Sequence, residues 1–165
     1  MARNRDEISL AIIAAAPHAR RFAYSLCRNA AEADDLVQSA IERVLSRGVP
    51  DGTDMKRWMF KICRNLWIDG LRAKSVRTDA APEIGLAAPE PVSAETEAAD
   101  RIMLQRTEAA IDALPPAYRE VLALVAVGGS SYKEASETLE VPVGTVMSRL
   151  ARARAMLADA TGYAA

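Results

Sequence analysis

The residues best suited to chemistry lie near the C-terminus, in the stretch VPVGTVMSRLARARAML from residue 141 to 157. A helix would place four of its polar residues along one side, at the spacing i, i+3, i+4 and i+7. These residues are Thr145, Ser148, Arg149 and Arg152. Arginines can bond guanine edges or phosphates, small hydroxyls can bond phosphates, and no acid is present to repel them. The pattern predicts a DNA-reading helix, and the alternative is an ordinary amphipathic helix with solvated arginines.

The elements expected before this helix would position it. A short helix is predicted over YKEASETL, residues 132–139, with Ser130 or Ser131 as its N-cap and the turn EVP after it. Two helices joined by such a turn form a helix-turn-helix. Upstream, one helix is expected to end near Leu114 and another to cover 117–127. On the DNA-reading helix, the side facing the core should consist of Val146, Leu150, Ala153 and Leu157.

A second candidate site for nucleic acid lies in the predicted helix MKRWMFKICRNLWIDGLRAK, which begins at residue 55. Residues 55–78 hold seven bases and one acid, and apolar stripes that include Phe60 and Trp67 flank the polar stripe. Cations for phosphates beside rings for stacking are typical of proteins that bind single-stranded or melted DNA. A solvated basic face is the alternative. The polar stripe consists of Arg57, Lys61, Arg64, Asn65 and Arg72.

Charge and composition indicate the organisation of the chain. The 165 residues carry a net charge of −1, but residues 1–78 hold 14 basic and nine acidic side chains. Residues 79–100 hold six acids, no base and three prolines, which predicts a flexible linker over 79–98. The rest is rich in helix-forming residues and shows no strand-like alternation. We therefore expect an all-α fold, with two small helical domains at 1–78 and 99–165.

Several classes of function are excluded by missing features. No run of eighteen apolar residues occurs, so neither a membrane span nor membrane insertion is expected, and a cytoplasmic location is predicted. Cys27 and Cys63 occupy apolar helical positions and are interpreted as small hydrophobic residues in a reducing compartment. The chain lacks a glycine-rich phosphate loop, a metal-ligand cluster and a nucleophile–base motif. We therefore expect no enzyme activity, metal or cofactor.

Three blocks of the sequence resemble, in order, bacterial RNA polymerase sigma factors of the extracytoplasmic-function type, which contain regions 2 and 4 of the sigma-70 family. The blocks are DDLVQSAIERVL, RWMFKICRNLWIDGLR and LPPAYREVLALVAVGGSSYKEASETLEVPVGTVMSRLARAR. The resemblance implies an alternative sigma factor that binds core RNA polymerase and directs promoter-specific transcription initiation, in a stress or environmental response. It also implies inhibition by an anti-sigma factor.

The resemblance further implies roles for particular residues. The N-terminal domain would grip the clamp coiled coil of the largest polymerase subunit and melt the minus-10 element, and the C-terminal domain would read the minus-35 element near the flap region. The residues implied to contact polymerase are Asp34, Asp35 and Gln38. Those implied to contact minus-10 DNA are Asp51, Gly52, Thr53, Arg57, Lys61, Arg64 and Asn65. Those implied to contact minus-35 DNA are Tyr132, Lys133, Thr145, Ser148, Arg149 and Arg152.

Two positions depart from the family pattern. Met147 stands where many relatives carry Lys or Arg, so the minus-35 preference is expected to differ. Glu140 stands in the turn where relatives usually carry Gly, and a left-handed conformation there would be costly for Glu. A stand-alone helix-turn-helix regulator is the rival interpretation. It would account for residues 101–165 and leave the N-terminal helices unexplained.

Overall fold

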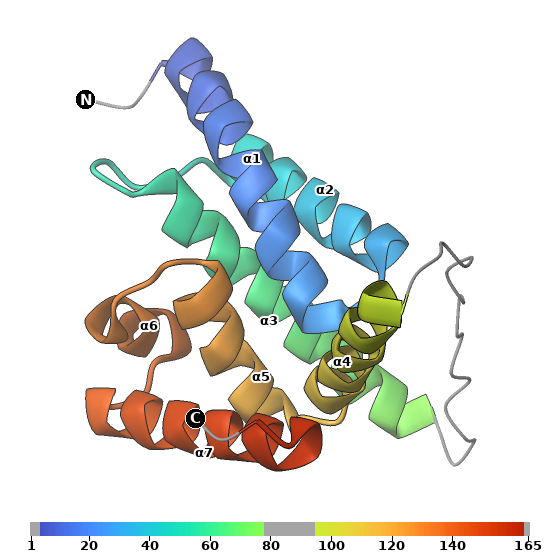
Figure 1. Cartoon of the computed structure of the whole chain (residues 1–165). Helices are drawn as coiled ribbons and strands as arrows, with labels where there is room; N and C mark the ends of the chain where they lie inside the picture. Colours follow the sequence, from blue (N-terminus) through green and yellow to red (C-terminus); the bar gives the residue numbers. More distant parts are fainter. Residues whose placement is uncertain (1–3, 78–94, 164–165) are drawn as a thin grey trace.

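The protein is built from helices in two units (Figure 1). The structure, a computed structural model, describes residues 4–77 and 95–163, and neither range contains a strand. The N-terminal unit contains α1 (Arg5–Cys27), α2 (Ala30–Arg47) and α3 (Met55–Arg77). The C-terminal unit contains α4 (Glu95–Asp112), α5 (Pro116–Leu122), the π-helical turn η1 (Ala123–Val127), α6 (Tyr132–Leu139) and α7 (Val143–Thr161). The predicted all-α fold with a four-helix C-terminal unit is confirmed.

Side-chain hydrogen bonds cap the starts of three helices. The Asn29 side chain accepts a hydrogen bond of 2.9 Å from the backbone N–H of Glu32 at the start of α2. The Asp54 carboxylate accepts from the first N–H groups of α3. Ser131, one of the two candidates, caps α6 and exchanges reciprocal hydrogen bonds with Glu134. These caps satisfy backbone donors that a helix start leaves unpaired.

The predicted linker can be compared with the structure only at its end. Residues 79–94 of the predicted 79–98 segment lie outside the described residues. Residues 95–98 are helical, because α4 begins at Glu95. The C-terminal helices therefore start earlier than the composition suggested.

The two units pack against each other and share one apolar core, an arrangement that the sequence did not predict. In Figure 1, helices α5, α6 and α7 of the C-terminal unit lie beneath the three N-terminal helices, with α6 beside α3. Phe22 of α1 and Phe60 of α3 stack with ring centroids 4.5 Å apart. Gly128 approaches this pair so closely that a Cβ there would lie 2.7 Å from the Phe60 ring. The shared core includes Leu26 and Trp67 from one unit, and Val121, Leu124 and Leu139 from the other.

This packing corrects the interpretation of two aromatic rings. Phe60 and Trp67 were expected to flank the basic stripe as stacking platforms for bases. They are 1% and 5% exposed, because the C-terminal unit covers them. In this arrangement both rings belong to the core and are closed to nucleic acid.

The cysteines behave as the sequence predicted. Both are free thiols, Cys63 is buried and Cys27 is half-buried. Burial raises the pKa of the Cys63 thiol to about 12, so it stays protonated at neutral pH. Within the described ranges, no helix combines the length and the apolar character that crossing a membrane requires.

Candidate nucleic-acid interface

The polar face of α7 is open to solvent. Val146, Leu150 and Ala153 are buried, as expected, while Leu157 is only half-buried. Ser148 and Arg152 are exposed, and Thr145 and Arg149 are half-buried beside them. Tyr132 and Lys133, at the start of α6, are also exposed. The structure therefore brings the predicted minus-35 residues of α7 together on one accessible face.

Two contacts within the C-terminal unit hold the arginines of this face. The Tyr118 hydroxyl accepts a hydrogen bond of 3.4 Å from Arg152, which raises the pKa of that guanidinium. Arg149 lies 3.7 Å from the Glu120 carboxylate. Arg149, Arg152 and Tyr118 line an open hollow of about 490 Å³ together with Thr145, Ser148 and Pro115. Both guanidiniums are thus oriented before any ligand arrives.

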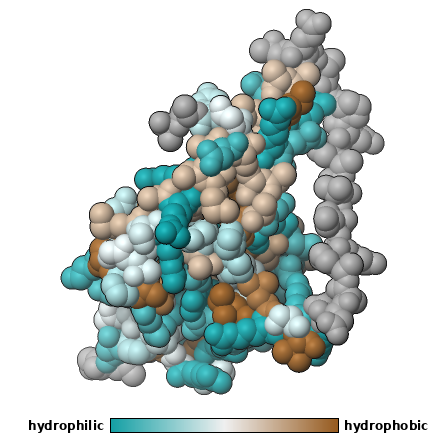
Figure 2. Space-filling view, turned by 90° about the horizontal axis from the view of Figure 1, so that it is seen from below, coloured by the Kyte–Doolittle hydropathy of each residue, from teal (hydrophilic) through white to brown (hydrophobic). Residues whose placement is uncertain are grey.

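The surface around this hollow is mixed in polarity. Figure 2 views the molecule from below, the side on which α7 lies in Figure 1, and hydrophilic side chains run between separate apolar patches there. Met147, the departure noted above, is 52% exposed. It therefore offers an apolar contact beside the polar face of α7.

The basic stripe of α3 has a different environment, because acidic side chains of the C-terminal unit cover it. Arg57 pairs with Glu137 of α6. Lys61 Nζ lies 3.0 Å from the carboxylate of Glu140, at the end of α6. The predicted minus-10 cations are brought together as expected, but here they face protein.

Arg64, the third cation of the stripe, meets a buried acid. Its Nε donates to Glu120 at 2.8 Å and its Nη1 donates to the Asn65 side chain at 3.2 Å. Glu120 is 3% exposed, so water contributes little to its solvation. Since Glu120 also lies 3.7 Å from Arg149, one carboxylate joins the two candidate DNA-binding surfaces.

The loop before α3 borders the covered stripe. Gly52 takes the left-handed conformation, with φ of 74°, and Thr53 donates its N–H to the Pro50 carbonyl at 3.3 Å. Gly52 and Thr53 line a hollow of about 300 Å³ that also includes Arg57 and Glu137. Asp51 is exposed next to them. The loop and the stripe thus form one continuous site, which α6 partly fills.

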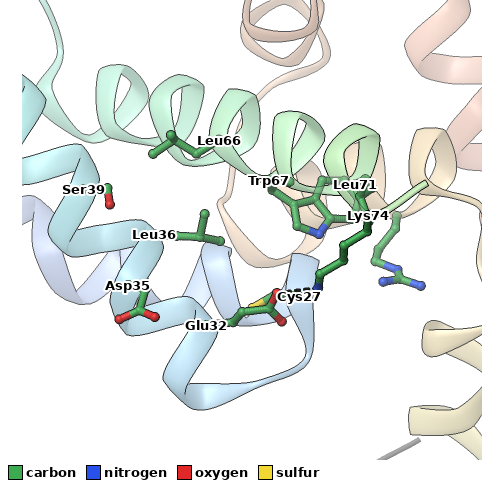
Figure 3. A pocket seen from close by; sticks show the side chains of 11 residues that line it. Cys27, Glu32, Asp35, Leu36, Ser39, Leu66, Trp67, Leu71 and Lys74 are labelled. Carbon is green, nitrogen blue, oxygen red and sulfur yellow. Dashed lines mark hydrogen bonds and ion pairs between the residues drawn. The ribbon is translucent and has the colours of Figure 1, made fainter. Parts of the chain in front are cut away.

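The predicted polymerase-contacting residues lie on the exposed side of α2. Asp34 accepts a hydrogen bond of 2.6 Å from Arg20, and this bond lowers the pKa of the Asp34 carboxyl. Gln38 donates to Glu42 at 3.5 Å. Asp35 lines a separate groove of about 270 Å³ between α2 and α3 (Figure 3). Asp34 and Asp35 therefore lie on two different surfaces, because adjacent residues of a helix point in different directions.

Figure 3 shows that this groove has an apolar floor and a charged end. Leu36, Leu66 and Trp67 point into it, and a 2.9 Å ion pair between Lys74 and Glu32 spans one end. Leu36 and Leu66 are both half-buried. The groove offers a protein partner apolar contact area bordered by charge.

Sequence reasoning missed Arg119, which joins the two units at the far end of their interface. Its guanidinium donates to the carbonyls of Leu26, at 3.0 Å, and Leu114, at 3.2 Å, and also to that of Asp112. It lies 5.9 Å from the centre of the Trp67 ring, and burial lowers its pKa. Arginine can satisfy carbonyls at helix ends in this way.

Sequence reasoning also missed the acids that cover the α3 stripe. A signal was available, because Glu137 and Glu140 are three residues apart around α6, while Arg57 and Lys61 are four apart on α3. Such spacings place like charges on one face of each helix. No rule of sequence pattern, however, says that two faces 80 residues apart meet.

The arrangement is shared with known proteins of transcription initiation. Residues 12–77 match the family model "Sigma-70 region 2", and residues 104–157 match "Sigma-70, region 4". The chain is 36% identical over 154 residues to the ECF RNA polymerase sigma factor EcfG of Rhodopseudomonas palustris, covering 92% of this chain and 83% of that one. It is also 36% identical over 143 residues to ECF sigma factor SigE of Mycolicibacterium smegmatis, covering 84% and 55%.

A solved structure agrees. The sigma factor RpoE of Bartonella quintana, crystallised with the anti-sigma factor NepR, superimposes with a TM-score of 0.74 at 25% identity, over 93% of this chain and 96% of that one. A fold with a region 2 unit and a region 4 unit defines the sigma-70 class. The chain belongs to the ECF family of RNA polymerase sigma factors.

Proposed function

We propose that this protein binds core RNA polymerase, without catalytic activity of its own, and directs it to promoters that carry a minus-35 and a minus-10 element. The observation that carries the proposal is the open face of α7, with its oriented arginines, in one chain with a region 2 unit. A stand-alone regulator would need the open face of α7 but would not need the region 2 unit.

In this proposal the C-terminal unit reads the minus-35 element. Arg149 and Arg152 reach base edges or phosphates of the major groove from α7, and Thr145 and Ser148 bond phosphates. Tyr132 and Lys133 contact the DNA backbone from the start of α6. Support comes from the placement of the four α7 residues around an open hollow and from the absence of acid along this face of α7.

The N-terminal unit, in the same proposal, binds polymerase and opens the DNA. Asp34, Asp35 and Gln38 contact the clamp coiled coil from the exposed side of α2, and the C-terminal unit contacts the flap. Arg57, Lys61, Arg64 and Asn65 meet the minus-10 strand, and residues 51–53 hold an everted base. Extruding a base costs a few kcal/mol, so a shaped site for it would offset a real penalty.

An anti-sigma factor is proposed as the inhibitor, and the cytoplasm as the location. Support comes from the Bartonella quintana relative, which was solved in complex with NepR. That relative covers nearly the whole of this chain.

Run-off transcription with core RNA polymerase tests the proposal. The template is a pool of genomic fragments, and transcript starts are read by sequencing with and without the protein. We expect new starts that share two sequence elements upstream. Promoter-specific DNA binding without polymerase, and no new starts, would favour the stand-alone regulator.

A matched pair of variants locates the minus-35 contact. Arg149→Ala with Arg152→Ala should abolish most starts, whereas Arg154→Ala, an exposed arginine elsewhere on α7, should leave them unchanged. Equal activity of both variants would contradict the assignment of this face.

A further inference from the structure

The ion pairs between the two units are arranged with one polarity. Arg57, Lys61 and Arg64 of α3 pair with Glu137, Glu140 and Glu120 of the C-terminal unit. At the end of α1, Arg28 likewise pairs with Glu108, at 3.6 Å, and with Asp112, at 3.1 Å. In each of these pairs the N-terminal unit supplies the base and the C-terminal unit supplies the acid. The interface is thus complementary in charge along its length.

The acids of the C-terminal unit bind the α3 cations to which the proposed function assigns a nucleic acid strand. Three successive cations, one per helical turn of α3, each meet a carboxylate, as they would meet successive phosphates. The side chains of Arg57, Lys61 and Arg64 are 32%, 38% and 23% exposed. Phosphates and these carboxylates cannot occupy the same guanidinium and ammonium donors at once.

Apolar packing beneath the ion pairs also holds the two units together. Phe60 is covered by Gly128 and the end of η1, and Trp67 by Arg119. Exposed ion pairs alone contribute little, whereas a shared apolar core favours a single compact arrangement. Separation of the units would uncover the rings and the cations of α3 in one step.

We propose that the free protein closes on itself, with the acidic face formed by Glu120, Glu137 and Glu140 seated on the basic stripe of α3, so that DNA binds this stripe only after the two units separate. The proposal rests on the minus-10 role given to the stripe above. Glu120 connects the two surfaces, because it bonds Arg64 in the closed form and stays beside Arg149 of its own unit.

Small-angle X-ray scattering of the full chain tests the closed form without reference to DNA. A compact chain of this length has a radius of gyration of about 15 Å, and a tethered open pair is several ångström larger. We expect the wild type to be near the compact value at low salt, and Glu137→Gln with Glu140→Gln to be expanded. The matched control is Asp100→Asn with Asp159→Asn, which changes the net charge equally at exposed positions that pair with no residue of α3. A wild type already as large as the open pair would overturn the proposal.

Fluorescence anisotropy with a labelled 20-nucleotide single strand tests the masking. The variant at 137 and 140 should bind it about threefold to tenfold more tightly than the control variant. Equal affinities would show that charge alone, and not release of the stripe, governs binding, and would overturn the masking. Adding Arg57→Ala and Lys61→Ala to the open variant should cancel the gain. A gain that survives this addition would contradict the minus-10 assignment itself, while the scattering result would still report on closure.

Discussion

The two candidate DNA-binding surfaces use similar side chains in opposite situations. The face of α7 is open, and its arginines are held by Tyr118 and Glu120 of their own unit. The stripe of α3 is covered, and its cations are held by acids of the other unit. The first surface is therefore ready for a ligand, whereas the second must exchange its partners.

This difference shows that the intrinsic affinity of a surface for DNA and its accessibility to DNA are separate properties. A contact within one unit orients a side chain at no cost to later binding, because the contact persists or is replaced locally. A contact between units makes binding depend on the free energy of separating them. The apparent affinity is then the intrinsic affinity multiplied by the fraction of molecules that are open. A partner that separates the units would thus activate the α3 stripe without touching it.

The largest expected effect concerns Arg119, which holds the far end of the closed interface. Arg119→Ala leaves the carbonyls of Leu26 and Leu114 without their donor, and should reduce the free energy of unfolding by about 2–4 kcal/mol. Urea denaturation followed by circular dichroism measures this loss.

The control for Arg119 is Arg154→Ala, which removes an exposed arginine and should change stability by less than about 0.5 kcal/mol. Arg119→Lys keeps the charge but not the fork of donors, so it should fall between the two. Equal stability of the variants at 119 and 154 would mean that the junction does not depend on these hydrogen bonds.

The next effect compares the two surfaces directly, in the free chain and in the polymerase complex. In the free chain, Arg152→Ala should weaken binding to promoter duplex by about 1–3 kcal/mol, whereas Arg57→Ala should change it little, because Arg57 is already paired. In the complex with polymerase, both variants should weaken promoter binding. Anisotropy titrations on one promoter fragment measure all four values, and equal losses in the free chain would remove the distinction between open and covered.

Local features of the fold were predictable from the sequence, since short-range chemistry determines them. The caps at Asn29, Asp54 and Ser131 follow from side chains that accept backbone hydrogen bonds, and the buried side of α7 follows from helical periodicity. The family assignment, which the similarity to known sigma factors confirms, depended on motifs that each lie within one continuous stretch of sequence.

The packing of the two units was not predictable from those same rules. Phe60 and Trp67 flank a basic stripe whether they face a base or a protein core, so periodicity cannot distinguish the two. The sequence pattern indicates that Glu120 is an ordinary polar residue of a short helix, yet it is buried between two arginines. Such contacts depend on which surfaces meet across a long separation in sequence.

A smaller effect tests whether an individual pair helps to hold the stripe. Lys61→Glu and Glu140→Lys should each destabilise the closed form, and the double variant should recover part of the loss. A double-mutant cycle should give a coupling energy of about 0.5 kcal/mol, as is usual for pairs with partly exposed side chains. A coupling energy of zero in urea denaturation would mean that the apolar packing alone closes the units.

An effect of similar size concerns Glu140, where the left-handed turn favours glycine and the ion pair with Lys61 favours glutamate. Its backbone is left-handed, with φ of 56° and ψ of 42°, as the sequence analysis anticipated for this turn. Glycine adopts that conformation without strain, so Glu140→Gly should stabilise the turn by about 1 kcal/mol while losing the pair with Lys61. Glu140→Gln keeps the strain and loses only the charge. We therefore expect Gly to be about 0.5–1 kcal/mol more stable than Gln in urea denaturation, with both equally expanded in scattering. If Gln were as stable as Gly, the left-handed turn would carry no strain, and the role of Glu140 would lie only in its contact with α3.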